Sequence, residues 1–399
     1  MGVAGIIAEY NPFHLGHVHQ LTETRRVMGE ESALVCVMSG NFVQRGECAI
    51  VDKWSRARAA LLGGADLVLE LPTPWATASA ESFARGAVEL LAATGVVDTL
   101  SFGSEAGVLE DLRRAARCMD SAEYRDGLHR ELGRGLSFAA AREGAVRAVL
   151  GSAADCLATP NNNLAVEYLR ALPADMEAIT VKRVGVGHDG AAAGGFASAS
   201  AIRAMLRGGD GVGARAYLPQ EMAAELERAM AAGAAPASLL HAERAILARL
   251  RAMTADDFAA LPDSGAAEGL PARLVRAAAG ALSLEGFCQI AKTKRYAHAR
   301  LRRLALWAFL GLRAEDRSAH IPYIRVLGLN GRGRELLGKM KQTCTLPVIT
   351  KPAHAKSLTG EGRALFHRES GYTDLFALCT PQPQRCGLEW TTGPMVLPD

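Results

Sequence analysis

Short apolar runs, spaced by segments of helix length, constrain the fold of the N-terminal quarter of the chain more than any other feature. The runs are Val3–Ala8, Ala33–Met38, Asp66–Leu71 and Asp98–Phe102. They do not alternate with polar residues, which is typical of strands covered on both faces of a sheet. The segments between them, near residues 14–28, 53–62 and 80–93, are compatible with helices. This order predicts an α/β fold with a Rossmann-like parallel sheet and helices on both faces.

The pattern changes further along the chain. Charge-rich helical sequence fills residues 107–150, and after it come a helix near 164–172, a strand at Ala178–Val184, a Gly/Ala-rich loop and a helix near 200–207. The stretch Gly208–Gly213 (GGDGVG) predicts a flexible connection and a domain boundary. We therefore expect an α/β domain over residues 1–210 and a mainly helical domain over residues 211–399. Within the second domain, Tyr323–Leu329 and Leu346–Thr350 are predicted strands.

Composition excludes several classes of protein. The longest apolar run of the second half, Leu304–Leu312, has nine residues and is about half of a membrane span. The N-terminus, Met1–Ala8, has neither the basic region nor the cleavage site of a signal peptide. The eight cysteines are far apart and form no CxxC pair, which argues against a zinc ribbon and against a disulfide framework. We expect a cytoplasmic protein with reduced thiols and no membrane partner.

The segment Glu9–His19 (EYNPFHLGHVH) follows a predicted strand and opens a predicted helix. His14 and His17 are three residues apart and therefore share one helix face. Gly16 lets a ligand approach the backbone, and a helix N-terminus favours phosphate groups. Together these features predict that two imidazoles and a helix end bind a triphosphate and stabilise the negative charge that develops during attack on its α-phosphate. The alternatives are two structural histidines, or a zinc site, which lacks a nearby third ligand and HExxH spacing.

The HxGH pattern after a first strand resembles the nucleotidyltransferase superfamily, and longer strings resemble the bacterial tRNA(Met) cytidine acetate ligase family. In chain order the strings are AEYNPFHLGHVH, VMSGNFVQRGE, KWSRARAALLGGADLVLELP, FGSE, PNN, KR near HD (Lys182, Arg183, His188, Asp189), SASAIR, KTKRY and YIRVLGLNGRGRELL. They extend from residue 8 to residue 337, so the resemblance covers nearly the whole chain.

The resemblance implies ATP-dependent acetylation of N4 of the wobble cytidine, position 34, in elongator tRNA(Met), through acetyl-adenylate. The implied substrates are ATP with Mg²⁺, acetate and tRNA; no protein partner and no dedicated metal site are implied. Residues 1–210 would be the ATP-binding catalytic domain, and residues 211–399 would bind tRNA.

The same resemblance assigns residues to roles. His14 and His17 are the expected catalytic residues. The expected ATP-binding residues are Ile7, Ala8, Glu9, Tyr10, Asn11, Pro12, Phe13, His14, Leu15, Gly16, His17, Val18, His19, Gln20, Gly103, Asn161, Asn162, Arg183, Ser198, Ser200 and Arg203. The chain departs from the family pattern at Asn163, where an apolar residue is usual, and at Ala201, where a threonine-like residue is usual. Turn formation for Glu9, Tyr10 and Asn11, helix capping for Asn161 and Asn162, and a surface position for Arg183 are the alternative roles.

The balance of 45 Lys+Arg against 42 Asp+Glu conceals one basic segment, Lys292–Arg303, with six basic residues and no acidic residue. Basic side chains with Tyr296 and His298 between them suit phosphate contact and base stacking on RNA. A solvated helix face is the alternative. Lys292, Lys294 and Arg295 are the candidate tRNA-binding residues, and Arg332, Arg334, Lys339 and Lys341 could extend that surface.

Two other functions remain open at this level. The first is an HxGH-type adenylyltransferase that acts on a small phosphorylated metabolite, for which ATP turnover would be indifferent to tRNA. The second is a non-catalytic RNA-binding module that keeps a relic nucleotide site.

Overall fold

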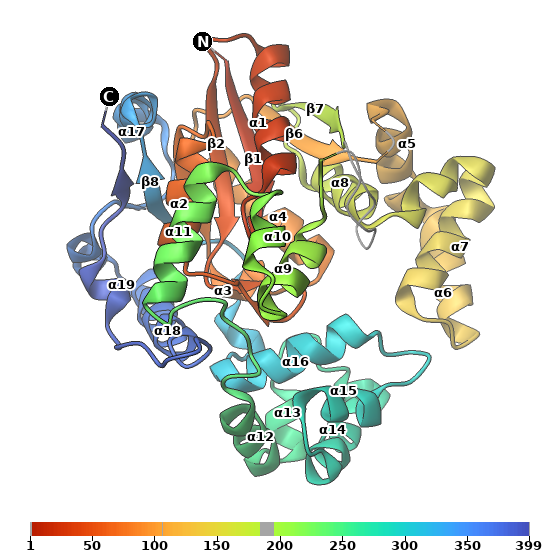
Figure 1. Ribbon diagram of the computed structural model, residues 1–399. Coiled ribbons are helices and arrows are strands. Elements are labelled where there is room, and N and C mark those ends of the chain that lie inside the picture. Colours follow the sequence, from red (N-terminus) through yellow and green to blue (C-terminus); the bar gives the residue numbers. More distant parts are fainter. Residues whose placement is uncertain (1, 106, 184–194, 399) are drawn as a thin grey trace.

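The computed structural model describes residues 2–105, 107–183 and 195–398, and within these ranges a sheet of eight strands forms the centre of the molecule (Figure 1). The strands of the sheet are β1 (Val3–Ala8), β2 (Ala33–Ser39), β5 (Leu67–Leu71), β6 (Thr99–Ser104), β7 (Glu177–Lys182), β8 (Ile324–Leu329), β9 (Val348–Ile349) and β10 (Met395–Val396). The predicted strand Val3–Ala8 is confirmed with its bounds, and the other predicted strands differ by a few residues at their ends; Val184 lies outside the described residues.

The parallel part of the sheet has the order β5-β2-β1-β6-β7. The chain runs outward from β1 through β2 to β5, then returns to the other side of β1 for β6 and β7. This is the order of a Rossmann-type sheet, so the predicted fold class is confirmed. The direction of winding reverses between β1 and β6, and the crevice at their carboxyl ends is where ligands bind in such sheets.

Helices cover both faces of the sheet, as the apolar strands require. One face carries α1 (Leu15–Met28), α2 (Lys53–Leu62), α9 (Ala199–Arg207), α10 (Gly211–Arg215) and α11 (Gln220–Ala231). The other carries α3 (Thr73–Ala76), α4 (Ala80–Ala93) and α8 (Pro160–Ala171), and beyond them α5 (Leu109–Met119), α6 (Ala122–Gly133), α7 (Phe138–Leu150) and the 3₁₀ turn Gly151–Ala158.

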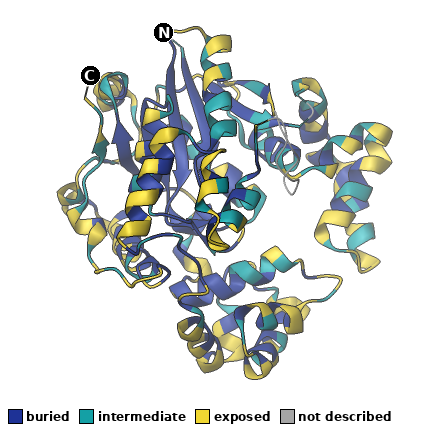
Figure 2. Ribbon diagram, in the orientation of Figure 1, coloured by how far each residue is buried: buried dark blue, intermediate teal, exposed yellow. Residues whose placement is uncertain are grey.

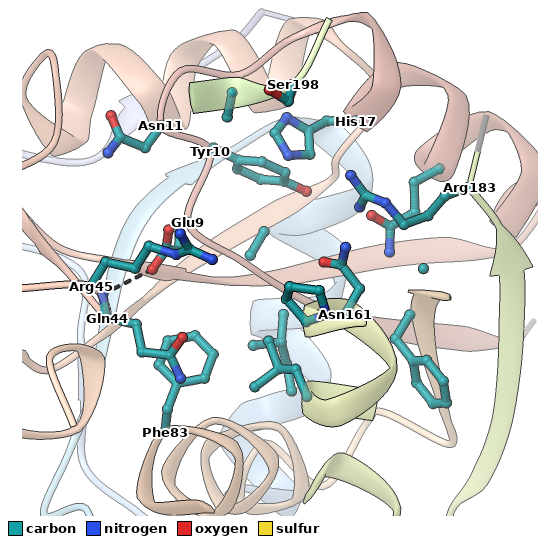
Figure 3. Close-up of a pocket in the computed structure, with 18 of the residues that line it drawn as sticks. Glu9, Tyr10, Asn11, His17, Gln44, Arg45, Phe83, Asn161, Arg183 and Ser198 are labelled. Atoms are coloured by element: carbon teal, nitrogen blue, oxygen red, sulfur yellow. Dashed lines mark hydrogen bonds between the residues drawn. The ribbon is translucent and has the colours of Figure 1, made fainter. Parts of the chain in front are cut away.

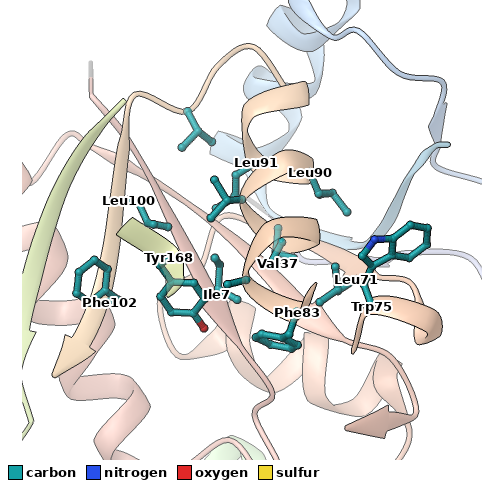
Figure 4. Close-up of a cluster of buried hydrophobic side chains, with 14 of the residues drawn as sticks. Ile7, Val37, Leu71, Trp75, Phe83, Leu90, Leu91, Leu100, Phe102 and Tyr168 are labelled. Atoms are coloured by element: carbon teal, nitrogen blue, oxygen red, sulfur yellow. The ribbon is translucent and has the colours of Figure 1, made fainter. Parts of the chain in front are cut away.

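Neighbouring side chains of β1 pack into hydrophobic cores on opposite faces of the sheet, because successive side chains of a strand point to opposite faces. Ile6 packs under α1 and α2, whereas Ile7 joins the cluster under α4 that Figure 4 shows. Each such apolar side chain contributes about 1.5–3 kcal/mol when it is fully buried. The central strands β1, β2 and β5 are almost entirely dark blue in Figure 2, whereas the helices expose their outer faces.

A separate helical unit lies beside the carboxyl end of the sheet (Figure 1). Its helices are α12 (Glu243–Ala252), α13 (Ala255–Ala259), α14 (Leu270–Gly280), α15 (Leu284–Ala291) and α16 (His298–Leu310). They enclose a core that contains Phe258, Phe287 and Trp307. A small hairpin of β3 (Phe42–Val43) and β4 (Glu47–Cys48), which follows β2, packs its apolar residues into this unit.

The chain after the helical unit returns to the sheet. Both predicted strands of this region are present as β8 and β9, and β8 pairs with β5 in the antiparallel direction. The remaining helices are α17 (Gly331–Thr343), α18 (Gly360–Phe376) and α19 (Leu388–Thr391). The division at residue 211 stays a prediction, but the sheet takes strands from both sides of it, so the second part is not a wholly separate helical unit.

The glycine-rich stretch that predicted this boundary is more ordered than expected. Its last three residues, Gly211–Gly213, belong to α10, which Asp210 caps by accepting a hydrogen bond from the Gly213 backbone N–H. A bilayer-spanning helix would need a longer apolar stretch than any helix in the described ranges provides.

Candidate active site

A cleft opens at the carboxyl ends of β1 and β6, at the reversal point of the sheet (Figure 3). Its volume, counted out to the open solvent, is about 1130 Å³. The lining comes from the end of β1 and the loop after it, from α1, the β3–β4 turn, α4, β6, the end of β7, α8 and the start of α9. Its residues are Ile7, Ala8, Glu9, Tyr10, Asn11, His14, His17, Gln20, Gln44, Arg45, Ala80, Phe83, Phe102, Gly103, Pro160, Asn161, Leu164, Tyr168, Arg183, Ser198 and Ala199. Phe83, Phe102 and Tyr168 also belong to the core under α4, so the floor of the cleft is the packed core (Figure 4).

The loop after β1 is held in place by buried side chains. Tyr10 has a left-handed backbone conformation (φ 48°), which is unfavourable for a bulky residue, and its buried ring packs against Phe13 and His17. The fully buried Arg56 of α2 donates hydrogen bonds to the carbonyls of Glu9 (2.7 Å) and Ser39 (3.0 Å). It therefore ties together the carboxyl ends of β1 and β2.

Glu9 faces the β3–β4 turn. Its Oε1 accepts a hydrogen bond of 2.8 Å from the backbone N–H of Gln44, which Figure 3 shows as a dashed line. Burial raises the pKa of the Glu9 carboxyl, while this hydrogen bond and the nearby Arg203 and Arg45 act in the opposite direction. The hairpin is thereby fixed as one wall of the cleft.

His14 and His17 contact each other at the start of α1. The Nδ1 atom of His14 accepts from the Gly16 backbone N–H at 3.1 Å, and the Nδ1 atom of His17 accepts from the His14 backbone N–H at 3.1 Å. The two rings stack with centroids 3.8 Å apart and planes 24° apart. Two backbone N–H groups at the helix end are therefore satisfied by the imidazoles.

This geometry determines the protonation of both rings. Burial is the main cause that lowers the pKa of His14 to about 3, with Arg183 and Arg203 adding to the effect. The pKa of His17 is also lowered well below its ordinary value, by burial and by His14 and Arg183. A neutral imidazole whose Nδ1 accepts a hydrogen bond carries its proton on Nε2. Both histidines therefore offer a neutral Nε2–H donor, and both line the cleft.

Glu105 organises the wall that α8 provides. Its carboxylate accepts hydrogen bonds from the Asn161 side-chain Nδ2 (2.6 Å), from the Thr159 hydroxyl (3.0 Å) and from the Asn162 backbone N–H (3.1 Å). Because Asn161 gives its amide N–H to this carboxylate, its Oδ1 remains as an acceptor at the cleft. Arg183 lies near the same carboxylate, and burial lowers the pKa of its guanidinium.

The capping role considered for the two asparagines is wrong, because α8 begins at Pro160, earlier than predicted, and both lie in its first turn. Pro160 suits this first helical position because its missing N–H would have no helical partner there. Asn162 is buried, and its Oδ1 accepts from the Glu105 backbone N–H. It thus fixes the end of β6, while Asn161 lines the cleft.

A smaller cavity adjoins the cleft across His14 and Arg183. Its lining includes Gly16, His19, Gln20, Gly103 and Ser198. A Cβ atom on Gly16 would lie 2.9 Å from Cε1 of His14, so glycine is required there to seat the imidazole. On Gly103 it would lie 3.3 Å from Cγ of Arg183, so this glycine makes room for the arginine.

The start of α9 faces the loop after β1. Ser198 caps the helix by accepting from the Ala201 backbone N–H, and it lines the cleft. Arg203 donates to the Asn11 carbonyl at 2.7 Å and to the Ser200 hydroxyl at 3.2 Å. Arg203 and Ser200 are thus engaged in holding the loop after β1.

The chain is similar to known proteins over nearly its whole length. The sequence matches the HIGH Nucleotidyl Transferase family over residues 1–388. A relative from Caldanaerobacter subterraneus subsp. tengcongensis named tRNA(Met) cytidine acetate ligase is 39% identical over 388 residues, 95% of either chain. A relative with the same name from Syntrophomonas wolfei subsp. wolfei is 36% identical over 99% of either chain. The chain belongs to the tRNA(Met) cytidine acetate ligase family.

This family includes solved structures. The crystal structure of Thermotoga maritima TmcAL bound with alpha-thio ATP superposes on the present chain with a TM-score of 0.92, at 34% identity over the full length of both. The apo form of the same protein gives a TM-score of 0.93. The resemblance inferred from sequence motifs is therefore confirmed, and so is the α/β fold.

The residues that the ligase resemblance assigned to ATP fall into two groups: those that line the cleft or the adjoining cavity, and those that line neither. Most lie at the cleft or at the adjoining cavity, whereas the described linings of both omit Pro12, Phe13, Leu15, Val18, Asn162, Ser200 and Arg203. Phe13 is fully buried against Gly63, so it belongs to the core. His188 and Asp189 of the KR–HD motif lie outside the described residues.

Nine residues of the cleft lining went unassigned at the sequence level: Gln44, Arg45, Ala80, Phe83, Phe102, Pro160, Leu164, Tyr168 and Ala199. Gln44 and Arg45 lie in the turn of the hairpin that follows β2, and β2 neighbours β1, so the rule that ligands bind beyond strand ends could have identified this segment. Phe83 and Tyr168 gave no local signal, because their helices reach the cleft only through tertiary packing.

The basic segment agrees only in part with the RNA interface expected for this family. Lys292, Lys294 and Arg295 are exposed. The stacking role for Tyr296 is wrong, since its ring is buried, Arg300 lies over it at 5.4 Å, and its hydroxyl donates to the Glu268 carbonyl. His298 pairs with Glu285 at 3.1 Å.

The four basic residues that were suggested to extend the surface of Lys292, Lys294 and Arg295 lie in another part of the molecule. Arg332, Arg334, Lys339 and Lys341 belong to α17, which Figure 1 places at the far end of the molecule from α15 and α16. Arg332 also donates to the carbonyls of Glu30 and Ser32. These residues therefore do not continue the surface formed by Lys292, Lys294 and Arg295.

Proposed function

We propose that the protein activates acetate with ATP as acetyl-adenylate and transfers the acetyl group to N4 of the wobble cytidine, position 34, of elongator tRNA(Met). The observation that carries this proposal is the pair of stacked histidines at the reversal point of the sheet, in a chain that matches tRNA(Met) cytidine acetate ligases over nearly its full length. Their Nε2–H groups and the N-terminus of α1 form a set of neutral donors suited to phosphate oxygens.

In the first step a carboxylate oxygen of acetate attacks the α-phosphorus of ATP, and pyrophosphate leaves. Negative charge builds up on the phosphate oxygens, and donors that are already oriented stabilise it without rearrangement. His14 and His17 are oriented by their Nδ1 hydrogen bonds, and Arg183 adds a positive charge at the cleft. Because both rings are neutral, they act as hydrogen-bond donors and do not transfer a proton.

In the second step the N4 amine of the cytidine attacks the acetyl carbon, AMP leaves, and the nitrogen loses a proton. Adenylation has already made the acyl group reactive, so the protein need only hold the amine close to the carbonyl carbon. Lys292, Lys294 and Arg295 would contact the RNA backbone from the helical unit. Residues 1–210 then supply most of the catalytic cleft, and residues beyond 211 supply the RNA-binding elements.

Magnesium is proposed as the counter-ion that enters with ATP. Among the described residues, no group of three or more histidine, cysteine, aspartate or glutamate side chains is arranged to hold a metal ion. The oxygens of the triphosphate are then the natural ligands of the cation.

The test is incubation with ATP, labelled acetate and tRNA(Met), followed by nucleoside analysis of the RNA. We expect label in N4-acetylcytidine at a single position. Label that never enters RNA, or that enters only with acetyl-CoA, would contradict the proposal. ATP turnover that is indifferent to tRNA would instead favour an adenylyltransferase of a small phosphorylated metabolite.

A further inference from the structure

A second large cavity lies between the helical unit and the β3–β4 hairpin. Its volume is about 720 Å³ counted out to solvent, and it is lined by Gly46, Glu47, Arg207, Ser238, Leu239, Leu240, Leu284, Glu285, Cys288 and Arg302. Leu239, Leu284 and Cys288 are buried and form an apolar floor, whereas Leu240 is 65% exposed. None of these residues lines the cleft at the carboxyl ends of β1 and β6, in which we propose that ATP binds and which is called the ATP cleft here.

The charges of this cavity are balanced in pairs. Arg302 contacts Glu47 at 2.9 Å and Glu285 at 3.3 Å, and Arg207 contacts Glu47 at 3.6 Å. Both guanidinium groups already have carboxylate partners, so the cavity is not primarily a phosphate site. An apolar floor edged by guanidinium and carboxylate groups suits a flat, neutral ligand with hydrogen-bonding edges. An unpaired nucleobase has this chemistry, and bases in RNA loops bind in such pockets by stacking and by edge contacts.

The hairpin turn places the cavity beside the ATP cleft. Gln44 and Arg45 line the cleft, and the next residues, Gly46 and Glu47, line the second cavity. Three residues of chain span at most about 11 Å, so the two cavities are near neighbours. A Cβ atom on Gly46 would lie 2.6 Å from the Arg303 backbone nitrogen, so the turn is packed directly on α16.

Basic side chains lie on the helical unit close in sequence to the cavity floor. Lys292, Lys294 and Arg295 are in the exposed loop between α15 and α16, the two helices that contribute Cys288 and Arg302 to the cavity. Because Tyr296 is buried, this loop offers charge but no free aromatic ring for stacking. Phosphate contact and base contact are therefore divided between the loop and the cavity.

We propose that this second cavity binds an unpaired nucleobase of the RNA substrate, adjacent in the strand to the cytidine that enters the ATP cleft. This inference rests on the proposed function. The hairpin turn then separates two successive bases, one directed to the adenylate and one held by the helical unit. The cavity would fix the position of the RNA strand along the reaction cleft.

The first experiment uses two exposed leucines of the helical unit. Leu240→Glu places a carboxylate at the cavity, whereas Leu282→Glu adds the same charge at a residue that is 88% exposed and outside the described cavity lining. We expect the Leu240→Glu variant to raise the KM for tRNA by at least about tenfold, the effect of losing one stacked base, with the KM for ATP unchanged. The Leu282→Glu variant should leave both values unchanged.

The second experiment is photo-crosslinking to the full-length protein of tRNA(Met) with 4-thiouridine on either side of the reacting cytidine. We expect a crosslink to the peptide that contains Leu239 and Leu240 or to the one that contains Leu284 and Cys288. If acetylation proceeds but both glutamate variants behave alike, or if the crosslinks fall elsewhere, the cavity proposal is overturned while the proposed function stands. If no acetyl group reaches the RNA, the proposed function itself fails, and the cavity proposal fails with it.

Discussion

His14 performs two tasks with its two ring nitrogens. Nδ1 caps α1, and Nε2–H remains as a donor at the cleft. Asparagine is also a good helix cap, so His14→Asn should keep the fold and remove only the donor. We expect acetyl transfer by this variant to fall by about 10²–10³-fold with tRNA binding retained. The measurements are single-turnover acetylation and a tRNA binding titration.

Two further variants serve as comparisons for this prediction. His14→Ala should lose the cap as well, with an additional loss of about 1 kcal/mol of stability in denaturant titration. His17→Ala should likewise lose acetyl transfer but not tRNA binding. Unchanged activity in the asparagine variant would show that the Nε2–H donor plays no part in the chemistry.

The buried imidazole of His14 also makes stability depend on pH. Its pKa is about 3 in the folded protein, whereas the unfolded chain binds a proton near pH 6.5. Between these values the unfolded state holds more protons, so stability decreases as pH falls from about 6.5 toward 3, by up to about 1.4 kcal/mol per pH unit. The His14→Asn variant should lose this part of the slope in denaturant titrations at pH 7, 6, 5 and 4. Parallel curves for the parent and the variant would contradict the assignment.

At the level of elements, Arg56 of α2 joins the ends of two strands and the loop that carries Glu9. Besides Glu9 and Ser39, its guanidinium donates to the carbonyls of Val51 and Gly40. A lysine has a single ammonium group and cannot donate to all four of these carbonyls at once. The Arg56→Lys variant should therefore leave some of the buried carbonyls without a hydrogen-bond donor. We expect a loss of about 2–4 kcal/mol in denaturant titration and a raised KM for ATP.

Arg58→Lys is the matched control for Arg56→Lys. Arg58 lies on the same helix, is 44% exposed and pairs with Glu225 at 2.8 Å, a contact that lysine can also make. Its stability should change by less than about 1 kcal/mol. Equal losses in the two lysine variants would mean that the carbonyl contacts of Arg56 have no special role.

How far the sequence could predict the structure also depends on the element. Strand β1 and helices α2 and α4 have the predicted bounds, because a buried strand or an amphipathic helix leaves a local pattern. The segment of β8 was recognisable for the same reason. Its pairing with β5 was not predictable, because the two strands are about 250 residues apart in the sequence and no local pattern shows which strands pair. Within the site, the residues near His14 were predictable from the motif. Phe13 was misassigned because a contiguous motif does not show which side chains turn inward.

At the scale of the whole molecule, a buried group of charges connects the two ends of the chain. Lys53 of α2 contacts Glu70 of β5 at 2.7 Å and Glu389 of α19 at 2.6 Å. Arg325 of β8 lies 3.5 Å from Glu389. Glu369 of α18 accepts hydrogen bonds from the backbone N–H and the hydroxyl of Thr73. Two cations thus face three carboxyl groups, and a proton on one carboxyl would balance the charge.

Of these three carboxyl groups, Glu70 and Glu389 contact Lys53, and we assign the proton to Glu369. Burial, followed by the nearby Glu70, raises its pKa to about 8. Because the folded protein retains a proton that the unfolded chain releases, the contribution of this group to stability decreases as pH rises from about 4.5 to 8. Glutamine has the shape of the protonated acid and can accept from the Thr73 N–H while it donates to the hydroxyl oxygen.

We therefore expect Glu369→Gln to match the parent protein at pH 5 and to be more stable than it at pH 8.5, in denaturant titrations at both values. Glu361→Gln, at an exposed residue in the first turn of the same helix, should change neither value. A Glu369→Gln variant that is destabilised equally at both pH values would show instead that the cations need this carboxyl in its charged form. In that case the attachment of the C-terminal helices to the sheet would depend on a complete set of ion pairs, and removing any one carboxyl would loosen both ends of the chain.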